Sequence, residues 1–296
     1  MSDAPSSEPI GLIAGSGRLP VLIAEGVRRA GLRVMVLGFR GLTDPALADV
    51  AEAFTWVGIS RVGGWIRWLQ RHGVRRAVLA GGVRKADMYT PLRLIRYLPD
   101  LRTAKLFYRT LRHDRRDNKV LLAVAEELGR EGIELISSVE YCREHLAAAG
   151  LMTRTAVPKS AEGDAEFAFR IARRSAELDI GQCLAVKDRD IMAVEAMEGT
   201  DKMIRRAGVL CRSGGWTLAK VARPEQDMRF DVPTIGPETI RRLKSARAAC
   251  VVLEAARTLL LDKPETLRLA DECGIAIVGM EPSGDPSPVV PEAGRG

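Results

Sequence analysis

The sequence predicts an α/β fold of two domains: a Rossmann-like N-terminal domain with a parallel sheet, followed by a second α/β domain. Short apolar runs alternate with stretches of helical periodicity. Two of the early runs end in glycine-rich loops. The length of 296 residues is sufficient for two hydrophobic cores. We place the domains at residues 1–136 and 137–283, with a disordered tail at 284–296.

The N-terminal domain is expected to form a doubly wound layer of buried strands and helices. The strands are predicted from apolar runs at Ile10–Ala14, Arg33–Phe39, Ala77–Ala80 and Ile133–Ile136. One helix is expected between Pro20 and Gly31, and another over 118–130, where the apolar residues share one helical face.

The second domain shows the same alternation of strands and helices. Its predicted strands are Cys183–Lys187, Ile191–Glu195, Trp216–Ala222, Ala249–Leu253 and Ile275–Gly279. The first two of these flank Asp188-Arg189-Asp190, which is typical of a hairpin turn. An alanine-rich stripe predicts a helix over 165–176, and prolines at 237 and 264 mark further helix starts.

The composition limits the partners and the compartment. A net charge of +7 favours anionic partners, but aromatic residues make up only 5% and no nucleic-acid module is recognisable, so no nucleic acid is expected. Five scattered cysteines and three scattered histidines favour neither a disulfide framework nor a zinc site. The N-terminus resembles no signal peptide and no apolar run could span a bilayer, so we expect a cytoplasmic protein, with peripheral contact to the inner membrane as a further option.

Two glycine loops follow predicted strands of the first domain and are candidate phosphate-binding elements. Glycine lets backbone N–H groups approach an anion at a helix N-terminus, and ligands of open α/β sheets lie beyond the carboxyl ends of strands. The candidate residues are Gly15, Ser16, Gly17 and Arg18 in the first loop, and Gly82, Arg84 and Lys85 in the second. The alternative is a pair of structural turns. Pro20 replaces the third glycine of a dinucleotide fingerprint and Phe39-Arg40 ends the second strand, so NAD is disfavoured.

Residues 84–116 interleave basic side chains with bulky apolar ones. This pattern suits an interfacial helix or a lid over acyl chains. It equally suits an amphipathic helix pair that covers the sheet.

Two acidic segments of the second domain carry the candidate chemistry. The first places Lys187, Glu195, Thr200 and Asp201 around a strand end and a glycine turn. The second, a proline-bounded loop, contains Asp227 and Asp231 among Lys220, Arg223 and Arg229. Carboxylate oxygens are the ligands that Mg²⁺ prefers, and magnesium shares them with substrate phosphates. Solvated surface charges and salt bridges are the alternative.

These segments, together with Ile10–Pro20 and Leu79–Lys85, resemble one family over residues 9 to 280. It is the two-domain, magnesium-dependent UDP-2,3-diacylglucosamine pyrophosphatase family of lipid A biosynthesis, distinct from the calcineurin-like enzyme. The phrases Ala193-Val-Glu-Ala-Met-Glu-Gly-Thr-Asp201 and Gln226-Asp-Met-Arg-Phe-Asp231 carry most of the resemblance.

The resemblance implies hydrolysis of UDP-2,3-diacylglucosamine to UMP and 2,3-diacylglucosamine 1-phosphate. It implies that Asp227 matches the family's essential aspartate, that water attacks the phosphorus on the sugar side, and that the chain forms a homodimer.

We therefore expect Asp227, with Asp201 or Glu195, to hold Mg²⁺ or another divalent cation against the diphosphate. Lys187 and Arg223 would neutralise charge in the transition state, and Asp231 is the candidate to orient the water. Thr200 and the glycine loops would bind substrate, clamped between domains hinged near 132–140. The sequence leaves open which carboxylate is a ligand and which a base.

The alternatives come from other functional classes. One is a non-catalytic module that binds a sugar nucleotide or an anionic lipid. A nucleotide-dependent oxidoreductase is disfavoured by the broken dinucleotide fingerprint, and a nucleic-acid binder by the missing module.

Overall fold

The computed structural model describes residues 8–82, 98–106, 108, 117–224 and 226–282. The described chain forms two compact units, each of which is described by itself. Unit 1 comprises the chain up to Glu144 together with Gln226–Val232, and unit 2 comprises His145–Glu225 and the chain from Pro233 onward. The division falls after Glu144 rather than after residue 136, because the segment following the last strand of unit 1 still packs on that unit. The expected tail at 284–296 lies outside the described residues.

Unit 1 is a five-stranded, entirely parallel sheet in the order β3-β2-β1-β4-β5. Its strands are β1 (Ile10–Ala14), β2 (Val34–Phe39), β3 (Ala53–Val57), β4 (Arg76–Ala80) and β5 (Glu134–Leu135). Its helices are α1 (Leu19–Arg29), α2 (Leu47–Val50), α3 (Val62–Arg71), α5 (Leu101–Leu106) and α6 (Asp117–Arg130). Across the sheet, successive strands are added on one side from β1 to β3 and on the other side from β4 to β5. This change of side between β1 and β4 confirms the Rossmann-like prediction.

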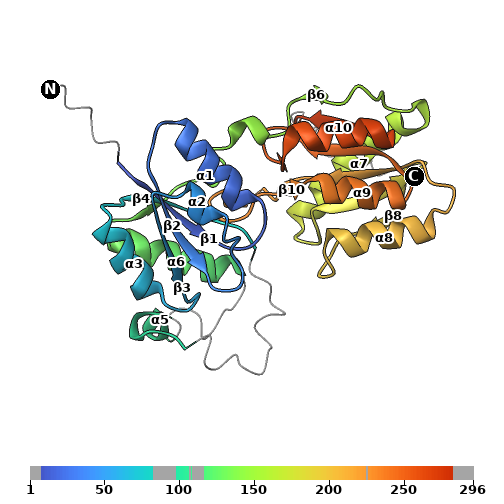
Figure 1. Ribbon diagram of the computed structural model, residues 1–296. Helices are drawn as coiled ribbons and strands as arrows, with labels where there is room; N and C mark the ends of the chain where they lie inside the picture. The colour runs from blue at the N-terminus through green and yellow to red at the C-terminus, as the bar shows by residue number, and fades with distance from the viewer. Residues whose placement is uncertain (1–7, 83–97, 107, 109–116, 225, 283–296) are drawn as a thin grey trace. The chain divides into compact units, whose positions relative to one another are not determined.

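The helices of unit 1 lie on both faces of the sheet (Figure 1), with α1 and α2 on one face and α3 and α6 on the other. The core on the second face combines strand residues such as Ile13 and Leu37 with Trp65 of α3, Leu106 of α5 and Leu128 of α6. Leu106 therefore belongs to the covering layer, as the helix-pair interpretation of residues 84–116 expects. The flanking residues 83–97 and 109–116 lie outside the described part.

Unit 2 is a six-stranded mixed sheet in the order β6-β13-β11-β9-β7-β8. Its strands are β6 (Gly150–Leu151), β7 (Cys183–Lys187), β8 (Asp190–Val194), β9 (Trp216–Lys220), β11 (Ala248–Glu254) and β13 (Ala276–Met280). A separate parallel pair joins β10 (Thr234–Ile235) to β12 (Leu259–Leu260). The helices are α7 (Lys159–Glu177), α8 (Thr200–Leu210), α9 (Pro237–Ser245) and α10 (Lys263–Cys273), and a 3-10 turn spans Arg143–His145 across the unit boundary.

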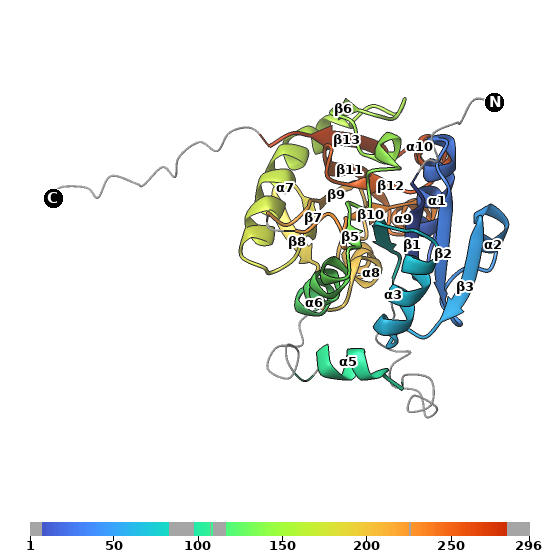
Figure 2. The same ribbon diagram turned by 90° about the vertical axis from the view of Figure 1, so that its left-hand side faces the viewer.

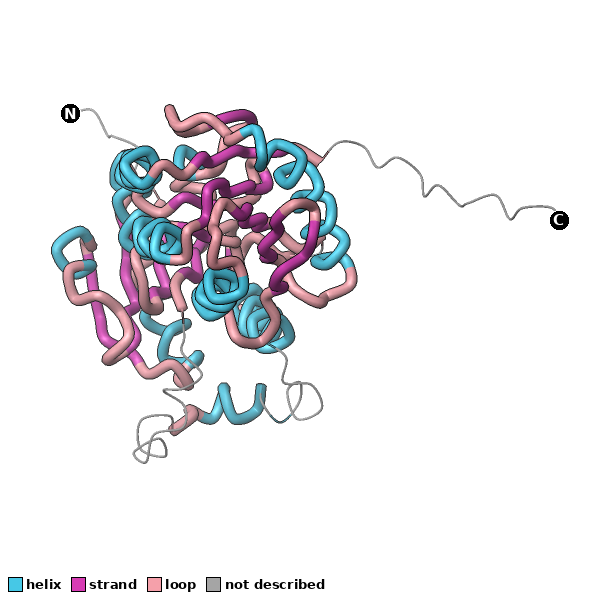
Figure 3. The backbone as a smooth tube through the Cα atoms, turned by 90° about the vertical axis from the view of Figure 1, so that its right-hand side faces the viewer, coloured by secondary structure: helices cyan, strands magenta, loops and turns pink. Residues whose placement is uncertain are grey.

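Figure 2 shows α7 on one face of this sheet and α8, α9 and α10 on the other. Two buried clusters correspond to these faces, one around Ala165 and Phe169 of α7, and the other around Trp216 and Ile240. The strands therefore lie between layers of helices (Figure 3). No helix of the described chain is long and apolar enough to cross a membrane.

The predicted hairpin joins β7 to β8. Lys187 pairs with Asp190, so the loop has only two residues, Asp188 and Arg189, with φ of 53° and 62°. Such a turn normally requires glycine or asparagine. Here the buried Asp164 carboxylate accepts hydrogen bonds from both loop N–H groups, at 3.0 and 2.7 Å, and stabilises the left-handed backbone.

Candidate active site

The two glycine loops lie side by side at the point where the strand order of unit 1 reverses. Gly15 N–H donates to Ala80 O at 2.7 Å, and Ser16 and Gly82 exchange two backbone hydrogen bonds of 2.9 Å. The Ser16 hydroxyl also donates to Gly82 O. A Cβ on Gly15 would lie 2.8 Å from that same carbonyl, so the contact requires glycine.

This pairing changes what the loops can do. The N–H groups of Gly15, Ser16 and Gly82 are donated to protein carbonyls and are not available to cradle a phosphate. The close approach of the two loops was predicted. In this arrangement, however, Gly15, Ser16 and Gly82 hold the two loops together. Of the other predicted loop residues, Gly17 adopts φ +98° and Arg18 forms an ion pair of 3.4 Å with Glu25. Arg84 and Lys85 lie outside the described residues.

Asp227 belongs to unit 1, although the sequence assigned it to the second domain. The Gln226–Val232 segment docks beyond the carboxyl end of β5. Met228 O accepts hydrogen bonds from the N–H and the hydroxyl of Ser138, at 3.1 and 2.9 Å, and Phe230 packs against the unit-1 core. The segment therefore lies at the edge of the sheet where ligands of open α/β sheets bind.

The Asp227 carboxylate is held in a fixed orientation by Arg229. Arg229 Nε lies 2.9 and 3.0 Å from the two carboxylate oxygens, Nη2 lies 2.6 Å from Oδ2, and the Arg229 N–H donates to Oδ1 at 3.0 Å. These hydrogen bonds lower the pKa of Asp227 below its ordinary value of 3.8, and they outweigh the opposing effect of burial. The group is therefore ionised at neutral pH and remains partly accessible, with 31% of its side chain exposed.

Asp231 lies one turn after Asp227 in the same segment. Its N–H donates to Asp227 O at 3.2 Å, and its side chain is exposed. The turn thus carries both carboxylates on unit 1.

In unit 2, strands β8, β9 and β11 run in the same direction and end at one edge of the sheet. Glu195 follows β8, and Lys220 ends β9. A chain of hydrogen bonds connects them: the Thr200 hydroxyl donates to Glu195 Oε2 at 3.0 Å, and Lys220 Nζ donates to Thr200 Oγ1 at 3.0 Å and to Thr234 O at 3.0 Å. Lys220 is buried, with 7% exposure.

Asp201 lies beside Thr200 in the first turn of α8 but is engaged elsewhere. Its carboxylate forms an ion pair with Arg242 of α9, and more than half of its side chain is exposed. Arg223 lies three residues beyond β9, on the same edge as Lys220, and forms an ion pair of 3.1 Å with Asp179.

Lys187 does not lie with Glu195 and Thr200, contrary to prediction. β7 is antiparallel to β9, so its first residue, Cys183, pairs with Lys220 while Lys187 lies at the opposite end of the strand. The four residue-to-residue steps from Cys183 to Lys187 separate the two ends by about 13 Å. The Lys187 Nζ donates to Gly215 O at 3.1 Å. The prediction for Lys187 was wrong because the β7–β8 hairpin reverses the chain. Lys187 and Glu195 are close in sequence but lie at opposite edges of the sheet.

The three predicted metal ligands, Asp227, Glu195 and Asp201, do not form a cluster within either unit. Among the described residues no group of three His, Cys, Asp or Glu side chains is arranged to hold a metal ion. Asp227 belongs to unit 1 while Glu195 and Asp201 belong to unit 2, so their sharing of one ion stays a prediction. Asp227 itself is an ionised, accessible carboxylate, which suits magnesium bound mainly through substrate phosphates and one or two protein carboxylates.

Two supporting residues were not singled out from the sequence. Glu254, at the end of β11, is only 1% exposed and accepts the Ala222 N–H at 2.8 Å, which orders the chain leading to Arg223. Lys220 stands in the sequence only as one of several charges beside the Asp227 loop. A charged residue that ends an apolar strand is the signal that both share.

The cysteines offer no activated nucleophile within the described chain. All five are free thiols, and four are buried. Burial raises the pKa of the Cys142 and Cys250 thiols to about 12, which keeps them protonated at neutral pH.

Comparisons with known proteins give a consistent result. The family models of the LpxI N-terminal domain and the LpxI C-terminal domain match residues 9–145 and 148–278. The chain is 33% identical over 287 residues to the UDP-2,3-diacylglucosamine pyrophosphatase LpxI of Caulobacter vibrioides, covering 94% of this chain and 99% of that protein.

Among solved structures, the UDP-glucose 4-epimerase of Thermus thermophilus in complex with NAD is 12% identical and covers 94% of this chain and 88% of its own, with a TM-score of 0.30. Glycinamide-RNase-transformylase T of Mycobacterium tuberculosis is 11% identical, covers 64% and 44%, and has a TM-score of 0.21. Neither score supports an argument. The two family models and the Caulobacter relative, which together span nearly the whole chain, establish that this protein belongs to the LpxI family.

Proposed function

We propose that this chain hydrolyses the diphosphate of UDP-2,3-diacylglucosamine to UMP and 2,3-diacylglucosamine 1-phosphate, a step of lipid A biosynthesis. Family membership over both domains supports this activity. The observation that carries the site is the Asp227–Arg229 pair, which presents an oriented, ionised carboxylate at the ligand-binding edge of the unit-1 sheet.

Hydrolysis of a phosphoric anhydride requires three things. Charge on the nonbridging oxygens must be neutralised, a water must be aimed in line with the leaving oxygen, and the leaving phosphate must be stabilised. Preorganised charged groups serve these ends better than mobile ones, because no reorganisation is needed during the reaction.

The geometry at Asp227 favours a role as cation ligand over a role as general base. A general base works best when its pKa lies near the working pH, and Arg229 shifts the pKa of Asp227 in the opposite direction. Asp231, exposed on the same turn, is the better candidate to orient the attacking water.

We propose Mg²⁺ as the cation, bound by Asp227 and by the substrate phosphates, where it would neutralise the nonbridging oxygens. Within unit 2, Lys220 and Arg223 lie at the carboxyl edge with Glu195 and Thr200, and this supports assigning to them the charge-neutralising role first expected of Lys187 and Arg223. Thr200, held between Lys220 and Glu195, supports the order of that edge. Attack at the phosphorus on the sugar side belongs to the same proposal.

The finer aspects of the location are also proposals. The substrate carries two acyl chains and partitions into a bilayer, so the chain should act at the inner face of the cytoplasmic membrane as a peripheral protein. A homodimer is the expected assembly.

The test is incubation of purified protein with UDP-2,3-diacylglucosamine and magnesium, with detection of UMP and the lipid phosphate. The Asp227→Asn variant keeps the shape of the side chain and one oxygen that can accept from the Arg229 N–H and Nε, but it removes the charge and the acceptor for Arg229 Nη2. We expect it to fold normally and to lose about 100-fold or more in turnover, the scale of one missing preorganised electrostatic group. Substrate binding without any turnover by the wild-type chain would instead favour a binding module.

A further inference from the structure

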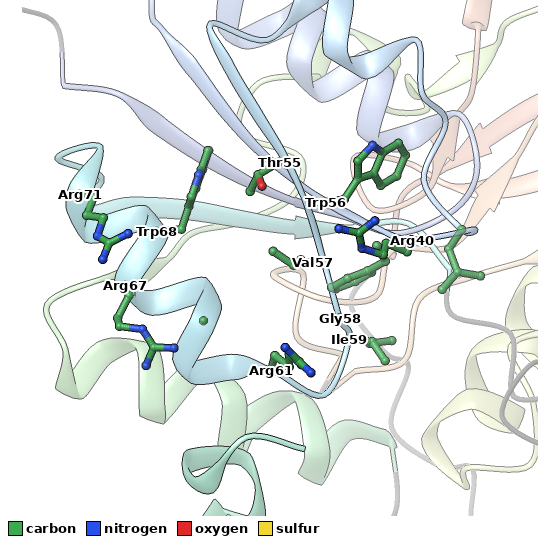
Figure 4. Close-up of a pocket in the computed structure, with 13 residues that line it drawn as sticks. Arg40, Thr55, Trp56, Val57, Gly58, Ile59, Arg61, Arg67, Trp68 and Arg71 are labelled. Carbon is green, nitrogen blue, oxygen red and sulfur yellow. The ribbon is translucent and has the colours of Figure 1, made fainter. Parts of the chain in front are cut away.

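A cavity of about 530 Å³ opens in unit 1 between the edge strand β3 and helix α3. Its volume is typical of a ligand-binding pocket. One wall is formed by β3, whose Thr55 and Val57 side chains lie on the same side as α3, and the other by the outward face of α3 (Figure 4). None of the residues predicted to be catalytic or to bind metal lines it.

The helix wall is a row of guanidinium groups. Arg61 directly precedes α3, and Arg67 and Arg71 share one helical face because they are four residues apart; all three line the cavity. Figure 4 shows them spaced along the helix. All three side chains are exposed, and none forms an ion pair or hydrogen bond with another residue in the part of the chain that the structure describes. Most other arginines of unit 1 differ, as the Arg33–Glu52 and Arg102–Glu131 pairs illustrate.

The spacing of the row limits what can bind there. At 1.5 Å per residue, Arg61 and Arg71 are separated by about 15 Å along the helix. One phosphate can accept from neighbouring guanidinium groups but cannot span that length. A surface that presents many phosphates can engage all three at once.

The rest of the lining is apolar and aromatic. Trp68 extends from α3 and stacks on His72, with ring centroids 4.0 Å apart, and Trp56 packs edge-on against Phe54 at 4.8 Å. Both indoles are only partly buried. Trp56, like Phe54, points to the face of β3 away from α3, so only Trp68 lies with the arginines (Figure 4). Tryptophan beside arginine is the composition of a membrane interface, where the ring lies at headgroup level and the cation meets lipid phosphate.

A second copy of this chain fits the surface less well. β3 is an edge strand, so two copies could in principle pair along it. Symmetric pairing would bring the same unpaired arginine row from each copy to one interface, and like charges there are destabilising. The charge of the row therefore favours an anionic partner.

We propose that the arginine groove, defined as Arg61, Arg67 and Arg71 of the α3 side with Trp68, is the surface by which this protein docks on anionic bilayers. The proposal rests on the proposed function only in that a diacylated substrate would be reached from such a surface. The arginines contact lipid phosphates, and the Trp68 indole inserts at headgroup level.

The test measures binding to vesicles of phosphatidylglycerol and of phosphatidylcholine, without substrate. The groove variant is Arg61→Gln with Arg67→Gln and Arg71→Gln. The matched control, Arg28→Gln with Arg205→Gln and Arg212→Gln, removes the same charge from exposed arginines elsewhere. At low salt we expect wild-type protein to prefer phosphatidylglycerol, and the groove variant to bind it about 100-fold more weakly, roughly fivefold per arginine. The control should bind much as wild type does.

Tryptophan fluorescence supplies an independent readout. The chain has four tryptophans, and Trp65 and Trp216 are 3% and 0% exposed, so the accessible indoles are Trp56 and Trp68, of which only Trp68 lies on the arginine side of β3. Brominated lipid should quench the wild-type emission. Trp68→Phe should abolish that quenching, whereas Trp56→Phe, on the other face of β3, should leave it in place.

Several results would overturn the proposal. These are equal losses in the groove and control variants, equal binding to both lipids, or binding that does not weaken as salt is raised. Loss of UMP binding in the groove variant with vesicle binding intact would assign the groove to a soluble phosphate instead. No substrate is present in this experiment, so a negative vesicle-binding result does not affect the hydrolase proposal. Conversely, a protein without hydrolase activity that still binds vesicles through the groove would support the docking proposal.

Discussion

Asp227 illustrates how a neighbouring residue determines the chemistry of a side chain. Four contacts from Arg229 orient its two oxygens and lower its pKa, and the same turn presents Asp231 to solvent. The short spacing Asp-Met-Arg brings both partners onto one turn. Arg229 is thus a positioning residue for the carboxylate.

Substitution of Arg229 tests this assignment. Arg229→Lys keeps the charge but loses the two-pronged contact, and Arg229→Gln loses both. Since partners that orient a ligand typically contribute about 10- to 100-fold, we expect turnover at neutral pH to fall by that amount, more for Gln than for Lys. Turnover equal to wild type in both variants would remove Arg229 from the mechanism.

The pH dependence of the same variants has a definite sign. In the wild type the pKa of Asp227 is depressed, so the pair stabilises the fold above the ordinary value of 3.8 and that stabilisation is lost as pH falls through the lower, folded value. In Arg229→Gln the pKa of Asp227 should rise toward 3.8. The pH at which activity is lost on acidification should therefore be higher in Arg229→Gln than in wild type. The difference in Tm between the two proteins should disappear at acidic pH.

Lys220 is the second residue whose role can be measured. It is buried, donates to Thr200 and Thr234, and points to the edge where Glu195 lies. Lys220→Met should lower kcat/KM by about 100-fold if its charge meets the diphosphate. Lys187→Met is the matched control at the opposite edge and should stay close to wild type. Similar losses in both would show that the carboxyl edge has no special role.

At the scale of elements, the two glycine loops hold β1 and β4 together where phosphate binding was expected. The sequence correctly indicated that the loops meet, because both follow strands that were predicted from apolar runs. It could not show that the backbone N–H and C=O groups of Ser16 and Gly82 form hydrogen bonds with each other. That outcome depends on the approach of two backbones, which no side-chain pattern encodes.

The start of α3 depends on a segment some forty residues away. No side chain caps the helix locally at Arg61. Instead, Thr103 Oγ1 accepts the Val62 N–H at 3.0 Å and the Asp100 carboxylate accepts the Gly64 N–H at 3.1 Å, while Asp100 also accepts from Thr103. The loop before α5 therefore caps α3 and holds α5 against it.

Removal of that cap should be visible in stability. Asp100→Ala leaves the Gly64 and Thr103 N–H groups without their acceptor, which costs about 1–2 kcal/mol and lowers Tm by about 2–8 °C. Asp100→Asn should lose less, because one amide oxygen can still accept. A calorimetric Tm unchanged in Asp100→Ala would show that the cap contributes nothing.

Elements were predictable from the sequence where burial is complete and less so elsewhere. Strands such as β1 and β9 are continuous apolar runs, and their bounds were close to expectation. β3 was not identified, because an edge strand is only half-buried and its Ala-Phe-Thr-Trp-Val sequence lacks a long apolar run. β10 and β12 are two-residue pairs that only tertiary contact defines.

For the whole molecule, the sequence predicted the fold class and the family, and both are confirmed. It assigned Asp227 to the second domain, whereas residues 226–232 return to unit 1 through Ser138 and the unit-1 core. Chain order alone cannot reveal such a return. The catalytic roles, the cation and the homodimer remain proposals.

The most direct test follows the oxygen of the attacking water. Purified wild-type chain and its Asp227→Asn variant are incubated with UDP-2,3-diacylglucosamine and magnesium in ¹⁸O-labelled water, with a chelator control, and both products are analysed by mass spectrometry. The account predicts unlabelled UMP, one labelled oxygen in the 2,3-diacylglucosamine 1-phosphate, and neither product in appreciable amount from the variant or with chelator. Full release of both products by Asp227→Asn, or label in the UMP, would contradict it.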